Sequence, residues 1–198
     1  MRLYDMEKSG NCYKVRLFLS LIGQQAQLQP VDLLAGEHRK PPYLAINPRG
    51  LVPALEDAGE VIVDSQAILV YLARRYADSA WFPQDPLSQG RIASWLSYAA
   101  HEVFDGPNKA RLHKKFAMPI DVALVDSTSR RVLALLDNQL GKHRWLAEGE
   151  AASIADIAVY PYIALAHEGD IDLSPYPQLN AWLGRVRELP GYIGMPGL

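Results

Sequence analysis

Two prolines with a glycine between them, in the stretch Asn47–Leu55 (NPRGLVPAL), constrain the fold more than any other part of the chain. The first proline disfavours a helical conformation at Asn47, and Gly50 permits a tight turn. A strand is predicted to start near Val52, because a proline at the first position of a strand removes no hydrogen bond that the ladder needs. The residues alone leave the peptide bond before Pro53 open between cis and trans, and trans is the commoner form.

The segment after this stretch predicts a β-hairpin and then a helix. Two short apolar runs, 54–56 and 61–63, flank a turn that contains aspartate and glycine, which is the pattern of a hairpin. Ser65 is predicted to cap the following helix. The apolar residues of that helix recur at helical spacing. They are Ile68, Leu69, Leu72 and Tyr76.

The first 46 residues predict a strand, a helix and a second strand. Residues 2–4 form a short apolar strand, and a polar loop follows over 5–11. The next helix carries an apolar stripe and ends at Gly23, a typical residue just after a helix. Residues 26–33 predict the second strand. A right-handed βαβ unit makes these two strands parallel, and the hairpin adds an antiparallel pair, so we expect a small mixed sheet.

The composition changes after residue 77. Residues 78–89 contain two prolines and no periodicity, which predicts a linker between a first domain, 1–77, and a second, 90–198. The second domain is helical in pattern, over 87–103, 120–140 and 179–189. A capping box at Ser153–Asp156 opens a further apolar helix, which Pro161 is expected to bend without ending it.

Charge and cysteine content narrow the class of protein. The chain has 198 residues and a net charge of −2, which gives no electrostatic reason to expect a nucleic acid or an anionic membrane as partner. No apolar run approaches the length of a membrane span. The one cysteine, Cys12, allows no internal disulfide and fits a reducing cytoplasm.

Two separate motifs resemble the glutathione transferases. Their pattern N-P-x-G-x-V-P-x-L, followed by a hairpin and [ED]-S-x-A-I, is matched over 47–68. The run SIADIA at 153–158, with Trp145-Leu146 before it, is similar to their second domain. The resemblance covers nearly the whole chain. It implies a thioredoxin-like α/β N-terminal domain, an all-α C-terminal domain, a cis peptide bond before Pro53, and glutathione as co-substrate without a metal.

The resemblance assigns the chemistry to the loop and helix after the first strand. Backbone amides and the helix dipole favour an anion there, and a thiolate is such an anion. Ser9 matches the catalytic serine of theta- and zeta-like transferases, while a nu-like alignment to T-P-N-x-x-K makes Asn11 the donor. Ser9 could equally be only a helix cap. Tyr4 is a second choice, and Cys12 is expected on the buried helix stripe.

The glutathione contacts carried over from the family lie on three segments. Asp64 and Ser65 match the pair that holds the γ-glutamyl group, and Val52 is expected to pair through its backbone with the cysteinyl part. His38 matches a histidine near the glycine carboxylate, whereas Leu51 stands where many members have lysine. The expected glutathione-binding set is therefore His38, Leu51, Val52, Pro53, Asp64 and Ser65.

A second substrate is expected against the helical domain. The candidates at the end of the helix over 87–103 and in the loop after it are Tyr98, His101, Phe104 and Arg111. A mixed apolar and polar wall suits a small hydrophobic electrophile. The same residues could instead belong to a dimer interface or to a solvated face.

The sequence thus predicts a cytoplasmic, homodimeric glutathione transferase that adds the glutathione thiolate to an electrophilic carbon. A nu-like, glutathione-dependent disulfide or peroxide reductase is the alternative within enzymes. A non-catalytic binding module on the same fold is the alternative from another class.

Overall fold

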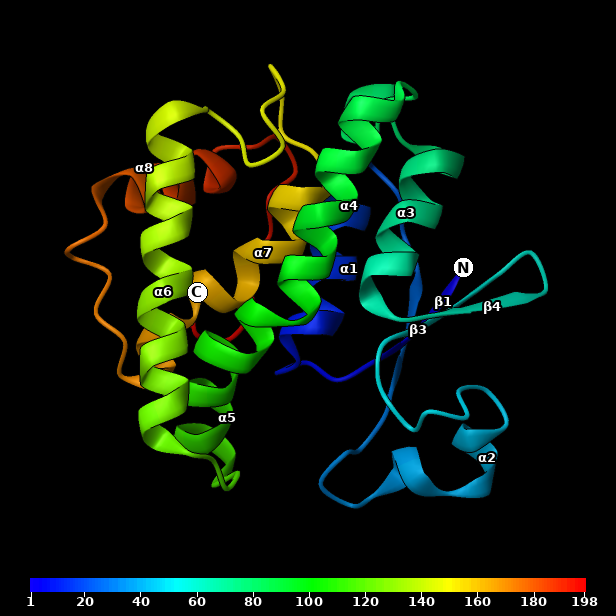
Figure 1. The fold of residues 1–198 in the computed structure, drawn as a ribbon. Coiled ribbons are helices and arrows are strands. Elements are labelled where there is room, and N and C mark those ends of the chain that lie inside the picture. Colours follow the sequence, from blue (N-terminus) through cyan, green and yellow to red (C-terminus); the bar gives the residue numbers. More distant parts are fainter.

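The computed structural model describes residues 1–198, which form a small α/β domain packed against a larger helical one (Figure 1). The first domain contains β1 (Arg2–Asp5), α1 (Gly10–Leu21), β2 (Gln27–Pro30), the 3₁₀ turn η1 (Glu37–Arg39), α2 (Pro41–Leu44), β3 (Ala54–Asp57), β4 (Glu60–Val63) and α3 (Ser65–Tyr76). The second contains η2 (Ser79–Trp81), α4 (Pro86–Ala100), η3 (Phe104–Asn108), α5 (Lys109–Phe116), α6 (Val122–Lys142), α7 (Ile154–Ala164), η4 (Ala166–Gly169) and α8 (Pro177–Arg187).

The sheet has the mixed topology that the sequence predicts, with strand order β2-β1-β3-β4. Strand β1 pairs parallel to β2 and antiparallel to β3, and β3 and β4 form the hairpin. Its register sets Ala54 opposite Val63. The N-terminus of α3, which follows Val63, therefore lies beside Pro53, and the peptide bond between Val52 and Pro53 is cis as expected.

Helix α3 begins one residue earlier than the sequence pattern indicated. Asp64, and not Ser65, is its N-cap, and the Asp64 carboxylate accepts hydrogen bonds from the amides of Gln66 and Ala67. Asp64 has a φ of 79° and a ψ of 128°, which lies outside the left-handed helical region, so its backbone is strained. Ser65 is the first helical residue and is buried.

The segment after α4 is helical, which corrects the expectation of a loop around Arg111. A π-helical turn, η3, carries the chain through Pro107 and leads directly into α5. At its other end, α4 begins at Pro86, inside the expected linker, because Asp85 caps it and proline is favoured at the first helical position. No helix has the length and apolar character needed to cross a membrane.

Helix α7 is the centre of the hydrophobic core, since all of its residues are buried. It continues through Pro161 to Ala164. Helix α1 of the first domain packs directly against it. A Cβ atom at Gly10 would lie 2.4 Å from Cε1 of Tyr162, so this close approach of the two helices requires glycine at position 10.

The predicted capping box at the start of α7 is present and is fully buried. The Asp156 carboxylate accepts hydrogen bonds from the amides of Ser153 (3.0 Å) and Leu146 (3.1 Å) and from the indole of Trp182 (2.9 Å). Burial raises the pKa of this carboxyl, although these donors partly offset the effect. One side chain thus joins α7, the preceding loop and α8.

We expect Asp156→Ala to lower the free energy of unfolding by about 3–9 kcal/mol, because it leaves three buried donors without an acceptor and each costs about 1–3 kcal/mol. Denaturant unfolding measures this. The matched control is Asp121→Ala, which removes the exposed cap of α6 and should cost only about 1 kcal/mol. Equal losses in the two variants would contradict the assigned role of Asp156.

Candidate active site

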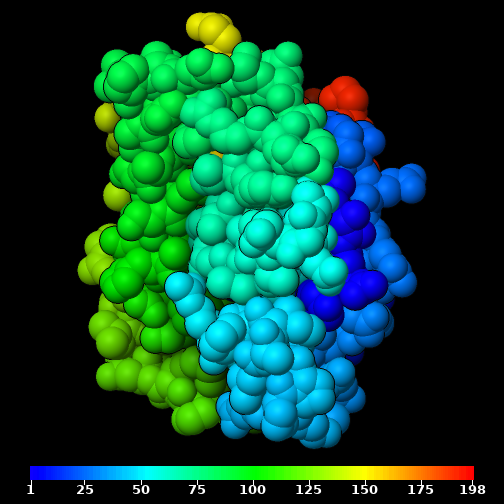
Figure 2. Space-filling model, turned by 90° about the vertical axis from the view of Figure 1, so that its right-hand side faces the viewer, coloured from blue at the N-terminus to red at the C-terminus, as the bar shows by residue number.

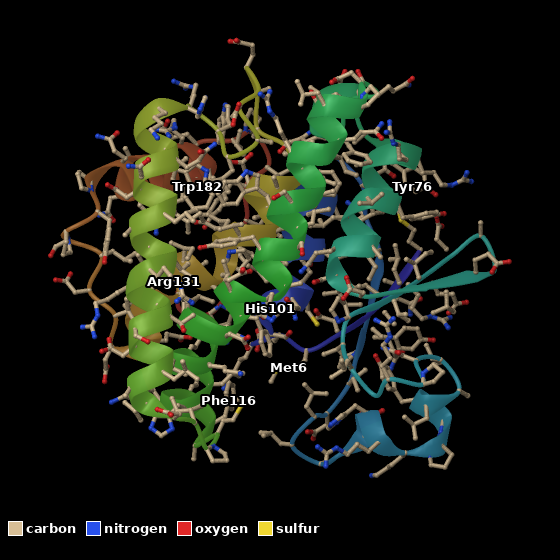
Figure 3. The ribbon with its side chains drawn as sticks, in the orientation of Figure 1. Met6, Tyr76, His101, Phe116, Arg131 and Trp182 are labelled. Atoms are coloured by element: carbon tan, nitrogen blue, oxygen red, sulfur yellow. The ribbon has the colours of Figure 1, made fainter.

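A cavity of about 330 Å³ lies between the two domains at the N-terminus of α1. Figure 2 shows the face on which the light-blue connection between β2 and β3 meets the green helices of the second domain. In Figure 3, Met6 and Phe116 mark the two sides of the cavity. Seven of the residues proposed from the sequence line it. They are Ser9, Asn11, His38, Leu51, Val52, Phe104 and Arg111.

Ser9 is the N-cap of α1, and its hydroxyl oxygen accepts a hydrogen bond from the Cys12 amide at 3.3 Å. This bond uses the oxygen as an acceptor and leaves the O–H free to donate toward the cavity. The cap role and a role toward a ligand anion are therefore compatible. The N-terminus of α1, with the positive end of its dipole, lies at the same end of the cavity.

The loop before Ser9 is held by side chains of α1. Arg16 forms an ion pair with Asp5 and donates to the Glu7 carbonyl at 2.8 Å. The Cys12 sulfur accepts from the Met6 amide at 3.4 Å. Cys12 is fully buried, as predicted, and burial raises the pKa of its thiol to about 12. A thiol in this state is a poor nucleophile, so Cys12 serves packing and loop geometry.

Val52 presents its main chain to the cavity. Neither its amide nor its carbonyl takes part in a backbone hydrogen bond, although the neighbouring Leu51 carbonyl accepts two, from the Tyr43 hydroxyl (2.7 Å) and the Asn47 side chain (2.6 Å). These two bonds fix the turn that the Asn47–Leu55 motif predicted. A donor and an acceptor are thus left side by side, in the form that pairs with an extended peptide.

Apolar side chains form the rim beside Val52. Leu34 and Leu51 line the cavity and are 84% and 62% exposed. Gly50 lets the His38 loop approach closely, since a Cβ there would lie 3.0 Å from the His38 carbonyl oxygen. Leu51, where many relatives of this pattern have lysine, therefore contributes apolar surface instead of a charge.

The helical wall carries its own polar residues. Arg111 is buried, pairs with Glu168 at 2.5 Å and donates to the Lys8 carbonyl at 3.1 Å, so it ties α5 to the loop of the first domain. Lys115 also pairs with Glu168. Burial raises the pKa of Glu168, but its two cations outweigh this and lower it. Asn108, from the π-helical turn, is buried with its Oδ1 unpartnered.

Three proposed residues do not reach the cavity. Tyr98 packs its ring against Trp95, at 5.4 Å between ring centroids. His101 is exposed and lines a separate cavity of about 380 Å³ together with Arg131. Tyr98 lies inside α4 and His101 directly follows it, whereas the helical residues that line the first cavity come from the π-helical turn, from α5 and from α7. Tyr4 donates to Glu56 at 3.3 Å on the sheet.

Pro53, Asp64 and Ser65 lie next to the cavity and do not line it. The hairpin register brings the N-terminus of α3 beside Pro53, which directly follows Val52. The exposed Asp64 carboxylate and the first amides of α3 therefore lie beside the unpaired backbone of Val52. No group of three or more His, Cys, Asp or Glu residues is arranged to hold a metal ion.

Comparison with known proteins agrees with this geometry. The family models for the glutathione S-transferase N-terminal and C-terminal domains match residues 3–80 and 120–190. Maleylacetoacetate isomerase of Pseudomonas aeruginosa is 32% identical over 91% of this chain and 88% of its own length. A glutathione S-transferase structure from Pseudomonas fluorescens is 32% identical, covers 98% of both chains and superposes with a TM-score of 0.91.

The chain belongs to the glutathione S-transferase family. Further members among its relatives are glutathione S-transferase F13 of Arabidopsis thaliana, 29% identical over the whole chain, and a possible glutathione S-transferase from Rhodopseudomonas palustris, whose structure superposes with a TM-score of 0.87. A thioredoxin-like first domain, an all-helical second domain and a glutathione-dependent activity follow from this membership.

A lysine is buried beneath this cavity. Lys14 matches the lysine of the nu-like T-P-N-x-x-K pattern, but the sequence alone assigned it no role. Lys14 has no exposed surface, and its Nζ has no hydrogen-bond partner. The Nζ lies 5.0 Å from the ring centroid of Tyr162. Burial lowers the pKa of Lys14 to about 7, and the nearby charge of Asp64 only partly opposes this effect. The T-P-N-x-x-K pattern points to this residue, whereas its burial follows only from the packing of the helices.

We expect Lys14→Met to raise the free energy of unfolding by about 3–5 kcal/mol at neutral pH, because one pKa unit corresponds to about 1.4 kcal/mol. The unfolded chain binds this proton below pH 10.5 and the folded chain only below about 7. Wild-type stability should therefore rise with pH across that window, and the advantage of methionine should shrink.

Denaturant unfolding at several pH values within the window measures this change. Lys40→Met, at an exposed lysine, is the matched control and should change stability little at any pH. An advantage of Lys14→Met that stays constant from neutral to alkaline pH would contradict a lowered pKa for the buried amine.

Proposed function

We propose that this protein binds glutathione in the cavity between its domains and transfers the thiolate to the electrophilic carbon of a small, largely apolar substrate. The observation that carries the proposal is the unpaired main-chain donor and acceptor of Val52, which share one cavity with Ser9 at the N-terminus of α1. A cysteinyl residue that pairs with Val52 would direct its sulfur toward the helix N-terminus.

The activation of the thiol is assigned to Ser9, with Asn11 as the rival donor. The amides at the N-terminus of α1 and one side-chain donor stabilise the charged sulfur and so lower its pKa. The γ-glutamyl end is assigned to Asp64 and Ser65, and the glycine end to the His38 loop. The protein contributes orientation and a stabilised anion, and glutathione contributes the nucleophile.

Isomerisation of a cis-unsaturated acid is the second candidate, because relatives of this chain are named maleylacetoacetate isomerase and maleylpyruvate isomerase. A thiolate can add to the double bond, permit rotation about the resulting single bond, and leave again. Lys8 and His38 line the cavity and no carboxylate does, which suits an anionic substrate. Arg111 also lines it, but its charge is paired with Glu168.

One experiment separates these candidates. Purified protein with glutathione is offered 1-chloro-2,4-dinitrobenzene, maleylacetoacetate, maleylpyruvate and a small disulfide. Conjugation alone supports the transferase, and cis–trans conversion without consumption of glutathione supports the isomerase. Reduction of the disulfide alone would contradict both. We further propose a cytoplasmic homodimer, the form expected from the family resemblance, and sedimentation of the purified protein tests the dimer.

We expect Asp64→Asn to weaken glutathione binding by about ten- to a hundredfold, because a hydrogen bond to a charged group contributes about 1.5–3 kcal/mol. Asparagine retains the cap and has the same size and branching as aspartate, so the backbone strain at this position is unchanged and the melting temperature should change little. Calorimetric titration measures the affinity. Asp121→Asn makes the same change at the cap of α6 and should bind glutathione like the wild type.

Ser9→Ala is expected to raise the pKa of the bound thiol and to reduce turnover about ten- to a hundredfold at neutral pH, with partial recovery at high pH. The thiolate absorbance of the complex as a function of pH, together with kcat, measures the effect. Asn11→Ala is the matched comparison in the same helical turn. If Asn11→Ala causes the larger loss and Ser9→Ala almost none, the donor is Asn11.

A further inference from the structure

The amine of Lys14 has no assigned partner in a place where an unpaired polar group is costly. It is fully buried on α1, one helical turn after Gly10, and no atom of the protein forms a hydrogen bond with its Nζ. Helices α3 and α7 both pack against α1. Burial in such a junction favours the neutral form of an amine, and a nearby negative charge shifts the balance toward the charged form.

One aromatic ring separates this amine from the cavity. Tyr162 of α7 lines the cavity, contacts the α1 N-terminus at Gly10, and has its ring centroid 5.0 Å from Nζ of Lys14. A ring at this distance attracts the protonated form of the amine. The Tyr162 ring therefore partly stabilises the protonated amine, but no hydrogen-bond acceptor lies near it.

The ionisable groups around the amine come from three elements. Asp64, at the N-terminus of α3, is the group whose charge acts on Lys14. Tyr162, on α7, stays neutral because burial raises its pKa. Arg111 and Cys12 act on the Tyr162 hydroxyl. Asp64 is thus the one charge that favours protonation of Lys14 against the effect of burial. A further negative charge in the cavity would shift the protonation equilibrium of Lys14 toward the ammonium.

We propose that Lys14 is the internal proton acceptor of the glutathione site, with an amine that is neutral in the empty site at mildly alkaline pH and takes up a proton when the thiolate of glutathione forms at the N-terminus of α1. The inference rests on the proposed function. The S–H bond of the cysteinyl group breaks and an N–H bond forms on Nζ, so the protein and its ligand together keep the proton. No oxidation or reduction occurs.

The coupling acts through charge and needs no direct contact. Bound glutathione with an ionised thiol brings two carboxylates, a thiolate and a single ammonium, so its arrival adds negative charge next to the junction. Across a dry junction, such a charge shifts a pKa by about a unit or more. The lowered pKa of Lys14 places this uptake near neutral pH.

The test compares two quantities in the same wild-type sample. Titration calorimetry in buffers of different ionisation enthalpy gives the protons released on binding glutathione, and difference absorbance gives the thiolate formed. At about pH 8 we expect clearly fewer protons than thiolates, by about half a proton or more, and near pH 5.5, where Lys14 is already charged, we expect equal numbers. One proton released per thiolate at both pH values would overturn the inference.

Two variants give an independent readout. Lys14→Met should release one proton per thiolate at both pH values, and its bound thiol should have a pKa about one unit higher than that of the wild type. Lys142→Met, at an exposed lysine in the last turn of α6, should behave like the wild type in both measurements. A bound-thiol pKa unchanged in Lys14→Met would also overturn the inference. If the wild type does not bind glutathione at all, both the proposed function and this inference are wrong. If it binds glutathione but releases one proton per thiolate, only this inference is wrong.

Discussion

The close contact between the start of α1 and the face of α7 is the constraint on which the site depends. Only glycine fits at position 10, because a Cβ would lie 2.4 Å from the Tyr162 ring. This contact fixes the orientation of the first domain relative to the second. It therefore also fixes the direction in which the N-terminus of α1 points. The cavity exists where the two domains diverge beyond this contact, with α1 at one end and the π-helical turn and α5 at the other.

The loop that carries Ser9 is held from both domains. Arg16 and Cys12 bind it from α1, and Arg111 binds the Lys8 carbonyl from α5. The bonds that the two arginines form with this loop are charge-assisted and therefore stronger than neutral hydrogen bonds. The position of Ser9 is thus set by the helices that hold the loop. Pre-organisation of this kind lets a donor act on a developing charge without reorganising first.

Local signals in the sequence were sufficient for most of the fold. The parallel β1–β2 pair, the hairpin, α3 and the capping box of α7 were predicted because each depends on residues near one another in the chain. Ser65 is predicted as the cap in place of Asp64, because both residue types are favoured at the N-cap and the sequence does not distinguish two adjacent ones. The helix around Arg111 was missed because Pro107 normally ends a helix, and the π-helical turn accommodates it. The burial of Lys14 depends on two packed helices, which no periodicity reveals.

The charges around the proposed glutathione site are unevenly distributed, and this fixes the direction in which a tripeptide would lie. The carboxylate of Asp64 is at the α3 end, whereas Lys8, His38 and Arg111 line the cavity without any carboxylate among them. A ligand with one ammonium and two carboxylates is best accommodated with its ammonium at α3 and its other end toward the His38 loop. Its central sulfur then lies at the N-terminus of α1. The apolar wall of Phe104 and Phe116 is left for the second substrate, on the open side of that sulfur.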